Sequence, residues 1–174
     1  MMIKHSYFRT TFFSLLLSTF ISHGAEWKFE ELNCSITLPE GNGWETVPPM
    51  PDLNAVGARS KKSARSILLN VIPLPNPQTK LNSSSIEGFK NDCFPPGKSK
   101  NVSWSETQFR GVPAYRAIGE RYMNNNELQR GLLLFIADGR IYKIVIMKLG
   151  EDPFKDEEIR ASIASFRFLK KPSF

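Results

Sequence analysis

The sequence has 174 residues, of which 41% are hydrophobic and 23% are charged. This is the composition of an ordinary soluble protein, and the length suits one domain with a substantial core. No stretch stays apolar for the ~20 residues that a membrane span needs, which argues against an integral membrane protein.

The first 25 residues have the pattern of a secretory signal peptide. Lys4 and Arg9 make the start positive, residues 10–21 are largely apolar, and small residues follow, with cleavage expected after Gly24 or Ala25. An uncleaved anchor is the alternative, but the apolar run is short for a span. We therefore expect an exported protein that works in the periplasm or outside the cell.

The expected domain structure is a signal peptide over residues 1–25 and a single domain over residues 26–174. The formal net charge of the whole chain is +6, and removal of the signal leaves 21 basic residues against 17 acidic ones, or +4. This charge weakly favours an acidic partner or an anionic surface and does not suggest a nucleic-acid binder.

Both histidines, His5 and His23, lie in the expected signal, so the mature domain has none. This excludes a Ser-His-Asp or Cys-His nucleophile, a histidine-ligated zinc ion and a histidine general base. No Gly-rich phosphate loop and no cysteine pair at metal spacing occurs. The acidic run at residues 156–158 lies where a helix start favours negative charge. Catalysis by a carboxylate or a lysine stays open as a third alternative, but we expect a protein without enzymatic activity, metal or cofactor.

The first part of the mature domain has the composition of strands separated by turn residues. Four strands are expected, at residues 27–29, 34–38, 56–61 and 66–73. The segment 45–54 contains Pro48, Pro49 and Pro51 and is expected to be an extended loop.

A first helix is expected after these strands, from about Ser85 to Cys93. The serines at 83–85 are cap residues, and Ile86, Phe89 and Cys93 lie on one face of the helix. Two strands follow, at residues 101–109 and 114–123.

The strongest element of the sequence is a β-hairpin over residues 128–147. Asp138-Gly139 suits a two-residue type I′ turn, which needs positive φ at both positions. Both faces of each arm are apolar, which is typical of a strand covered on both sides. We therefore expect the hairpin in the middle of a sheet.

A last helix is expected to begin with Asp152 as N-cap and Pro153 as its first residue. Its buried stripe would contain Ile159, Ile163 and Phe166. The predicted fold class is therefore α+β: an antiparallel β-sheet with helices packed on it, its four last long strands forming a meander.

The pattern resembles the PsbP-like family, which includes the PsbP protein of photosystem II, a Ran-GTPase release factor and bacterial DcrB-like exported proteins. Four motifs carry the resemblance: Ile36-Thr37-Leu38-Pro39 with Gly43-Trp44, Gly111-Val112-Pro113-Ala114, Asp138-Gly139-Arg140-Ile141-Tyr142, and Asp152-Pro153 with Ser165-Phe166-Arg167-Phe168. The resemblance covers residues 27–169. It implies a PsbP-like α/β/α sandwich and a non-enzymatic protein that docks onto a partner.

Cys34 and Cys93 are the only cysteines, and an exported protein meets an oxidising environment. Both lie on predicted core faces. A disulfide between them would close a long loop and stabilise the fold by roughly 4 kcal/mol in the entropic model. The alternative is two separately buried thiols.

Two surface features are candidate contact sites. Arg59, Lys61, Lys62 and Arg65 form the densest basic patch, which is either a docking patch for an acidic protein or lipid surface, or a solvated hairpin turn.

The proline-rich loops offer Pro49, Met50 and Phe94 as partly apolar contacts, or else are stiff connectors. From these features we expect an exported docking protein with an unknown protein partner. The alternative is a carrier or chaperone that binds a hydrophobic ligand or helix in an apolar groove between sheet and helix.

Overall fold

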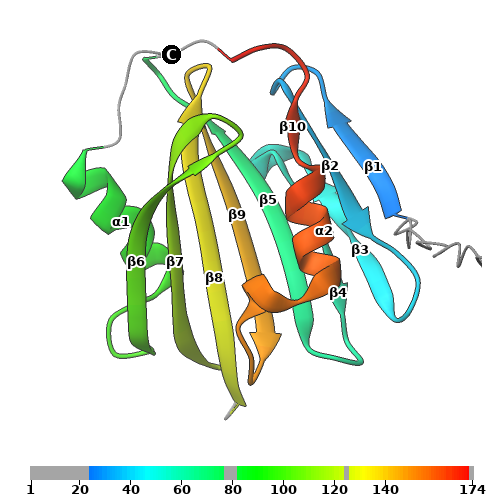
Figure 1. The fold of residues 1–174 in the computed structure, drawn as a ribbon, viewed down its shortest axis with the longest axis vertical. Helices are drawn as coiled ribbons and strands as arrows, with labels where there is room; N and C mark the ends of the chain where they lie inside the picture. Colours follow the sequence, from blue (N-terminus) through cyan, green and yellow to red (C-terminus); the bar gives the residue numbers. More distant parts are fainter. Residues whose placement is uncertain (1–23, 77–81, 124–125, 173–174) are drawn as a thin grey trace, which may run out of the picture.

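The computed structural model describes residues 24–76, 82–123 and 126–172. Within these residues the chain forms two antiparallel sheets (Figure 1). The larger sheet has the strand order β3-β4-β5-β9-β8-β7-β6. In chain order, its strands are β3 (Trp44–Met50), β4 (Ala55–Ser60), β5 (Arg65–Pro73), β6 (Ser99–Phe109), β7 (Val112–Met123), β8 (Asn126–Ala137) and β9 (Arg140–Leu149). The smaller sheet has the order β1-β2-β10, with bounds Gly24–Phe29, Cys34–Pro39 and Arg167–Phe168.

Helices lie on both faces of the larger sheet. They are α1 (Ser83–Cys93), α2 (Glu157–Ser165) and the short 3₁₀ helices η1 (Pro51–Leu53) and η2 (Pro153–Lys155). Helix α2 and the smaller sheet lie in front of the larger sheet in Figure 1, and α1 packs against the opposite side. We call these sides the α2 face, which carries Phe135 and Tyr142, and the α1 face, which carries Leu132 and Leu134. The architecture is antiparallel α+β, as expected.

The hairpin predicted over residues 128–147 is confirmed as β8 and β9. Asp138 and Gly139 have φ of 51° and 65°, as a type I′ turn requires, and Ala137 pairs with Arg140 beside them. The hairpin lies between β5 and β7, with hydrophobic clusters on both of its faces. Strands β6 to β9 are neighbours in chain order, so the expected meander is also present.

The prediction of an extended loop over residues 45–54 was wrong for its first part. Strand β3 forms there despite Pro48 and Pro49, because β3 is an edge strand and its register with β4 shifts between Val47 and Met50. Proline is tolerated at such edge and bulge positions, where its missing N–H breaks no ladder hydrogen bond.

The helices begin at other residues than expected. Asn82, not a serine, caps α1, since its side chain accepts the Ser85 N–H. Asp152 and Pro153 start the 3₁₀ helix η2, and α2 begins one turn later with Asp156 as its N-cap.

The start of the expected mature domain lies at the edge of the described residues. Residues 1–23 of the expected signal lie outside the described part, and strand β1 already includes Gly24 and Ala25. No helix in the described part of the chain is both long and apolar enough to cross a membrane.

The buried hydroxyl of Tyr142 fastens the smaller sheet to the larger one. It donates a 2.7 Å hydrogen bond to the Leu32 carbonyl, in the turn between β1 and β2, and the Tyr142 side chain is fully buried. Leu32 is buried as well, so water cannot readily replace this donor.

We predict that Tyr142→Phe lowers the free energy of unfolding by about 1–2 kcal/mol, because the buried Leu32 carbonyl loses its hydrogen-bond donor. Urea denaturation measures the change. Tyr115→Phe is the control, because the half-buried Tyr115 hydroxyl donates no hydrogen bond within the described residues. Equal stability of the wild type and Tyr142→Phe would contradict this role.

Candidate functional site

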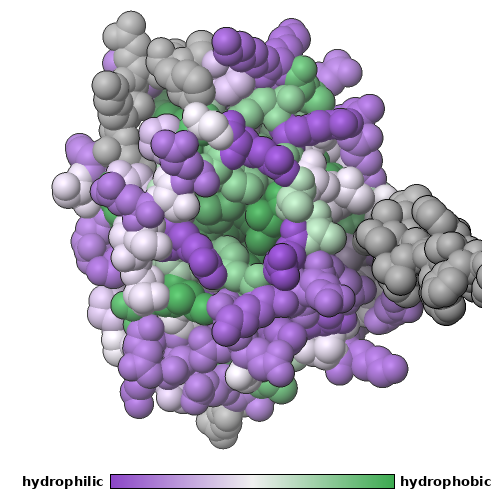
Figure 2. Space-filling view, in the orientation of Figure 1, coloured by the Kyte–Doolittle hydropathy of each residue, from purple (hydrophilic) through white to green (hydrophobic). Residues whose placement is uncertain are grey.

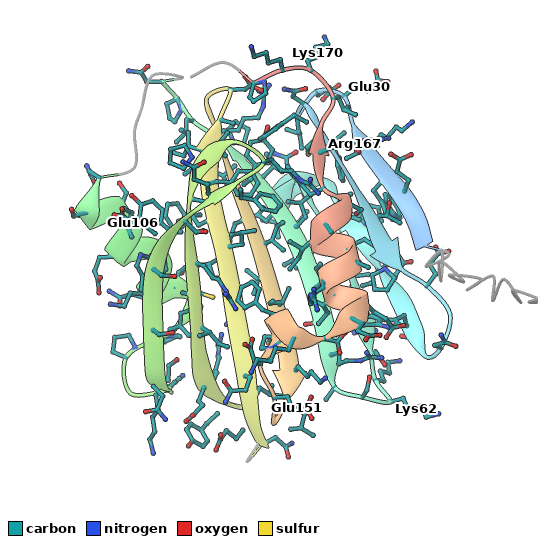
Figure 3. The ribbon with its side chains drawn as sticks, in the orientation of Figure 1. Glu30, Lys62, Glu106, Glu151, Arg167 and Lys170 are labelled. Atoms are coloured by element: carbon teal, nitrogen blue, oxygen red, sulfur yellow. The ribbon has the colours of Figure 1, made fainter. Side chains whose placement is uncertain are left out.

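The basic residues predicted to form a docking patch lie on β4, β5 and the turn between them. Arg59 and Lys61 each approach the carboxylate of Glu45 on the neighbouring strand β3, at 3.7 and 3.3 Å. Lys62 is exposed at the tip of the turn (Figure 3). Arg65 points to the α2 face instead of outward. The four cations therefore do not form one patch of free charges.

Arg65 supports the start of α2. Its guanidinium lies 3.0 Å from an Asp156 carboxylate oxygen and 2.6 Å from one of Glu158, and it covers the ring of Trp44 at 4.8 Å. Only 16% of the Arg65 side chain is exposed, too little for docking to a partner. This residue joins β5, β3 and α2.

Asp156 is the first residue of the predicted acidic run and has a structural role. Burial alone would raise the pKa of its carboxyl group, but hydrogen bonds from the Ile159 N–H, Arg65 and Lys148 outweigh burial and lower that pKa. A charged Asp156 is therefore the stable form, and it caps α2 where the helix dipole favours an anion.

The two cysteines are not bonded. Both are free and buried, Cys34 in the hydrophobic cluster of the α2 face and Cys93 in that of the α1 face. The larger sheet separates these two clusters. The structure therefore contains two separately buried thiols, which was the alternative to the predicted disulfide. Burial raises the pKa of each thiol to about 12.

The three residues predicted as loop contacts have different environments. Pro49 is exposed and Met50 half-buried on the edge strand β3. Phe94 is only 3% exposed and belongs to the α1-face core. Its ring occupies the space beside Gly119, where a Cβ atom would approach it to 3.1 Å. Phe94 is therefore a packing residue and not a surface contact.

The α2 face contains an apolar hollow surrounded by polar side chains (Figure 2). Half-buried hydrophobic side chains pack against the core of this face, among them Phe109 from β6, Phe154 from η2 and Ile163 from α2. Below them lie fully buried residues of the central hairpin, including Phe135. The half-buried side chains of this face therefore come from three separate elements, which only the folded arrangement of the sheet and helix α2 brings to one face.

Two arginines contact helical elements of this face. The Arg110 guanidinium donates a hydrogen bond to the Ala164 carbonyl of α2, so the turn between β6 and β7 is tied to that helix. Arg116 lies over the Phe154 ring at 4.1 Å and 3.9 Å from an Asp152 carboxylate oxygen, with 45% of its side chain exposed. The hollow therefore combines an apolar floor with a cationic border.

Sequence reasoning missed the residues of this hollow, although part of the signal is in the sequence. The alternation along β7 puts Arg116 on the same face as Ala114 and Val112. What alternation could not show is that Phe154 would come from a separate 3₁₀ helix and lie beneath that arginine.

Neither a family model nor a curated protein matches the chain. Among solved structures, it is similar to a protein from Bacteroides thetaiotaomicron VPI-5482, with a TM-score of 0.51 and 11% identity over 80% of this chain. The match spans 46% of that protein, about half of its length. A second similar structure is LpqN, involved in cell envelope biogenesis of Mycobacterium tuberculosis, with a TM-score of 0.46, 11% identity, and coverage of 76% of this chain and 82% of LpqN. At such low identity the likeness to the Bacteroides protein concerns the fold alone.

We predict that both thiols of the folded protein resist alkylation at pH 8, because both are buried and their pKa values are about 12. After denaturation without a reductant, both should react, which intact-mass spectrometry detects as two adducts. A native mass lower by two hydrogens, with no adduct after denaturation, would show that a disulfide forms after all.

Proposed function

We propose that the chain is an exported, non-enzymatic binding protein of the bacterial cell envelope that docks onto another envelope component. The apolar hollow beside α2 carries this proposal. Exposed apolar surface is costly in water, and a hollow with an apolar floor and a polar border is typical of a binding site. An apolar group of the partner would enter the hollow and contact Phe109, Phe154 and Ile163.

Export and family are parts of the same proposal. The signal-like pattern of the first 25 residues supports export. The order of the four motifs along residues 27–169 supports a PsbP-like domain, and the antiparallel α+β architecture is compatible with it. The absence of histidine from residues 26–174 supports a role without histidine acid–base catalysis.

A carrier or chaperone is the second candidate, and the position of the hollow favours it. The hollow lies between the larger sheet and helix α2, which is the arrangement expected for a groove that shields a hydrophobic ligand or helix (Figures 1 and 2). The two candidates share the site and differ in what occupies it.

We predict that native mass spectrometry of the protein, purified gently from its own host, detects a bound species. A second protein chain would support docking, and a small apolar adduct would support the carrier. The variant Ile163→Glu should lose the bound species, because it puts a charge at a half-buried position of the hollow.

Leu53→Glu is the matched control. Among the described residues, Leu53 is the most exposed large hydrophobic residue, at 59% exposure, and it lies on η1, at the β3–β4 connection. It should keep the bound species. A wild-type protein that carries nothing, or equal occupancy in Ile163→Glu and the wild type, would overturn the proposal that the hollow is the binding site.

A further inference from the structure

Three polar residues gather on the α1 face, on the side of the larger sheet away from the hollow. Ser99 of β6 pairs directly with Arg121 of β7, and Arg130 of β8 lies diagonally opposite Arg121, since Arg121 pairs with Leu128. Residues that pair directly share a face, and diagonal neighbours are about 7–8 Å apart. Strand pairing therefore puts these three polar side chains on one face of three neighbouring strands.

Two of the donors at this place are buried without a partner. The Ser99 Oγ and the Arg130 Nε atoms are shielded from solvent and form no hydrogen bond with any residue that the structure describes. A buried donor normally has a partner, because leaving it unpaired costs about 1–3 kcal/mol. Both atoms are therefore available to an acceptor that fits between them.

The charge of the two arginines is a second observation at this place. Among the described residues, no carboxylate forms an ion pair with Arg121 or Arg130. Lys143, on the same face of β9, does have a partner, because it lies 3.8 Å from Asp92 of α1. Two like charges on one face of neighbouring strands repel each other unless an anion lies between them.

Other features near Arg121 and Arg130 do not neutralise the charges of these two arginines. The charge of Arg121 interacts electrostatically with Cys93, at the carboxyl end of α1. At that end the helix dipole supplies about half a negative charge. That partial charge is too small to balance two guanidinium groups. Apolar side chains surround the site, with Leu128 and Met147 paired to the two arginines and Phe94 over Gly119, and they strengthen any charge-assisted hydrogen bond formed there.

We propose that Ser99, Arg121 and Arg130 form a binding site for an oxyanion, such as the phosphate group of a ligand. Arginine donates in a planar fork that suits phosphate oxygens, and a serine hydroxyl supplies one more donor. The phosphate belongs either to a lipid headgroup or to a soluble molecule. The site extends the proposed function to a second surface, and it is argued without the hollow beside α2.

The test is titration of the protein with inorganic phosphate at low ionic strength. Calorimetry measures the binding, and the melting temperature measures the effect of phosphate on stability. Phosphate should bind and raise the melting temperature of the wild type, because it binds the folded state only. Arg121→Gln and Arg130→Gln should each weaken phosphate binding by about tenfold or more, as expected for the loss of a charged hydrogen-bond donor.

Arg59→Gln is the matched control, since it removes the same charge from β4, where Arg59 lies beside Glu45. It should bind phosphate like the wild type. Absence of phosphate binding by the wild type, or equal weakening in Arg59→Gln, would overturn the proposal.

Ser99→Asp keeps the test decisive if an arginine variant fails to fold. The new carboxylate would pair with Arg121 across the strands, so this variant should melt at a higher temperature and no longer respond to phosphate. An unchanged response to phosphate would contradict the site.

Vesicles distinguish the two sources of the phosphate. Binding to phosphatidylglycerol vesicles but not to phosphatidylcholine vesicles, lost in Arg130→Gln, would identify a lipid headgroup. Binding of inorganic phosphate without vesicle binding would identify a soluble ligand. If phosphate binds but the hollow carries no bound species, the oxyanion site is supported and the proposed function fails. If the hollow carries a bound species but phosphate does not bind, the proposed function is supported and the oxyanion site fails.

Discussion

The stacking of Phe135 on Tyr142 across the central hairpin is the contact on which the rest of the structure depends. Their ring centroids are 5.1 Å apart and the planes are nearly parallel, at 5°. Phe166 and Phe168 meet both rings edge-on, at centroid distances between 5.3 and 6.2 Å. Phe166 ends α2 and Phe168 belongs to the smaller sheet, so one aromatic cluster holds the larger sheet, the helix and the smaller sheet together. Such pairs add about 0.5–1.5 kcal/mol each beyond the burial of their area.

This cluster also determines where the hollow lies. Helix α2 is held at its end by Phe166 and at its start by the contact of Arg65 with Asp156, so its position on the sheet is defined at both ends. The hydrogen bond from Arg110 to Ala164 fixes the β6–β7 turn to the same helix. The border of the hollow is therefore built from elements that are each fastened to the core. A site on rigid elements needs little ordering when a partner binds, which favours affinity.

Local signals in the sequence were enough to predict the central hairpin, because Asp138-Gly139 specifies its turn and the doubly apolar arms specify its central position. They also predicted the α+β class. Other features depend on pairing between distant segments, and periodicity does not contain that information. The pairing of Arg65 with Asp156 moved a basic residue out of the expected docking patch, and the sheet between Cys34 and Cys93 separated two thiols that both looked buried. Likewise, the site at Ser99, Arg121 and Arg130 appears only when the register of β6, β7 and β8 is known.

The central claim is that the hollow beside α2 receives the apolar part of a partner. The most direct measurement is photo-crosslinking in the host, with a benzophenone amino acid at position 163 inside the hollow and, separately, at position 53 on η1. We predict a discrete adduct from position 163, with a protein or a lipid, and none from position 53. Absence of an adduct at position 163, or the same adduct from both positions, would contradict the claim.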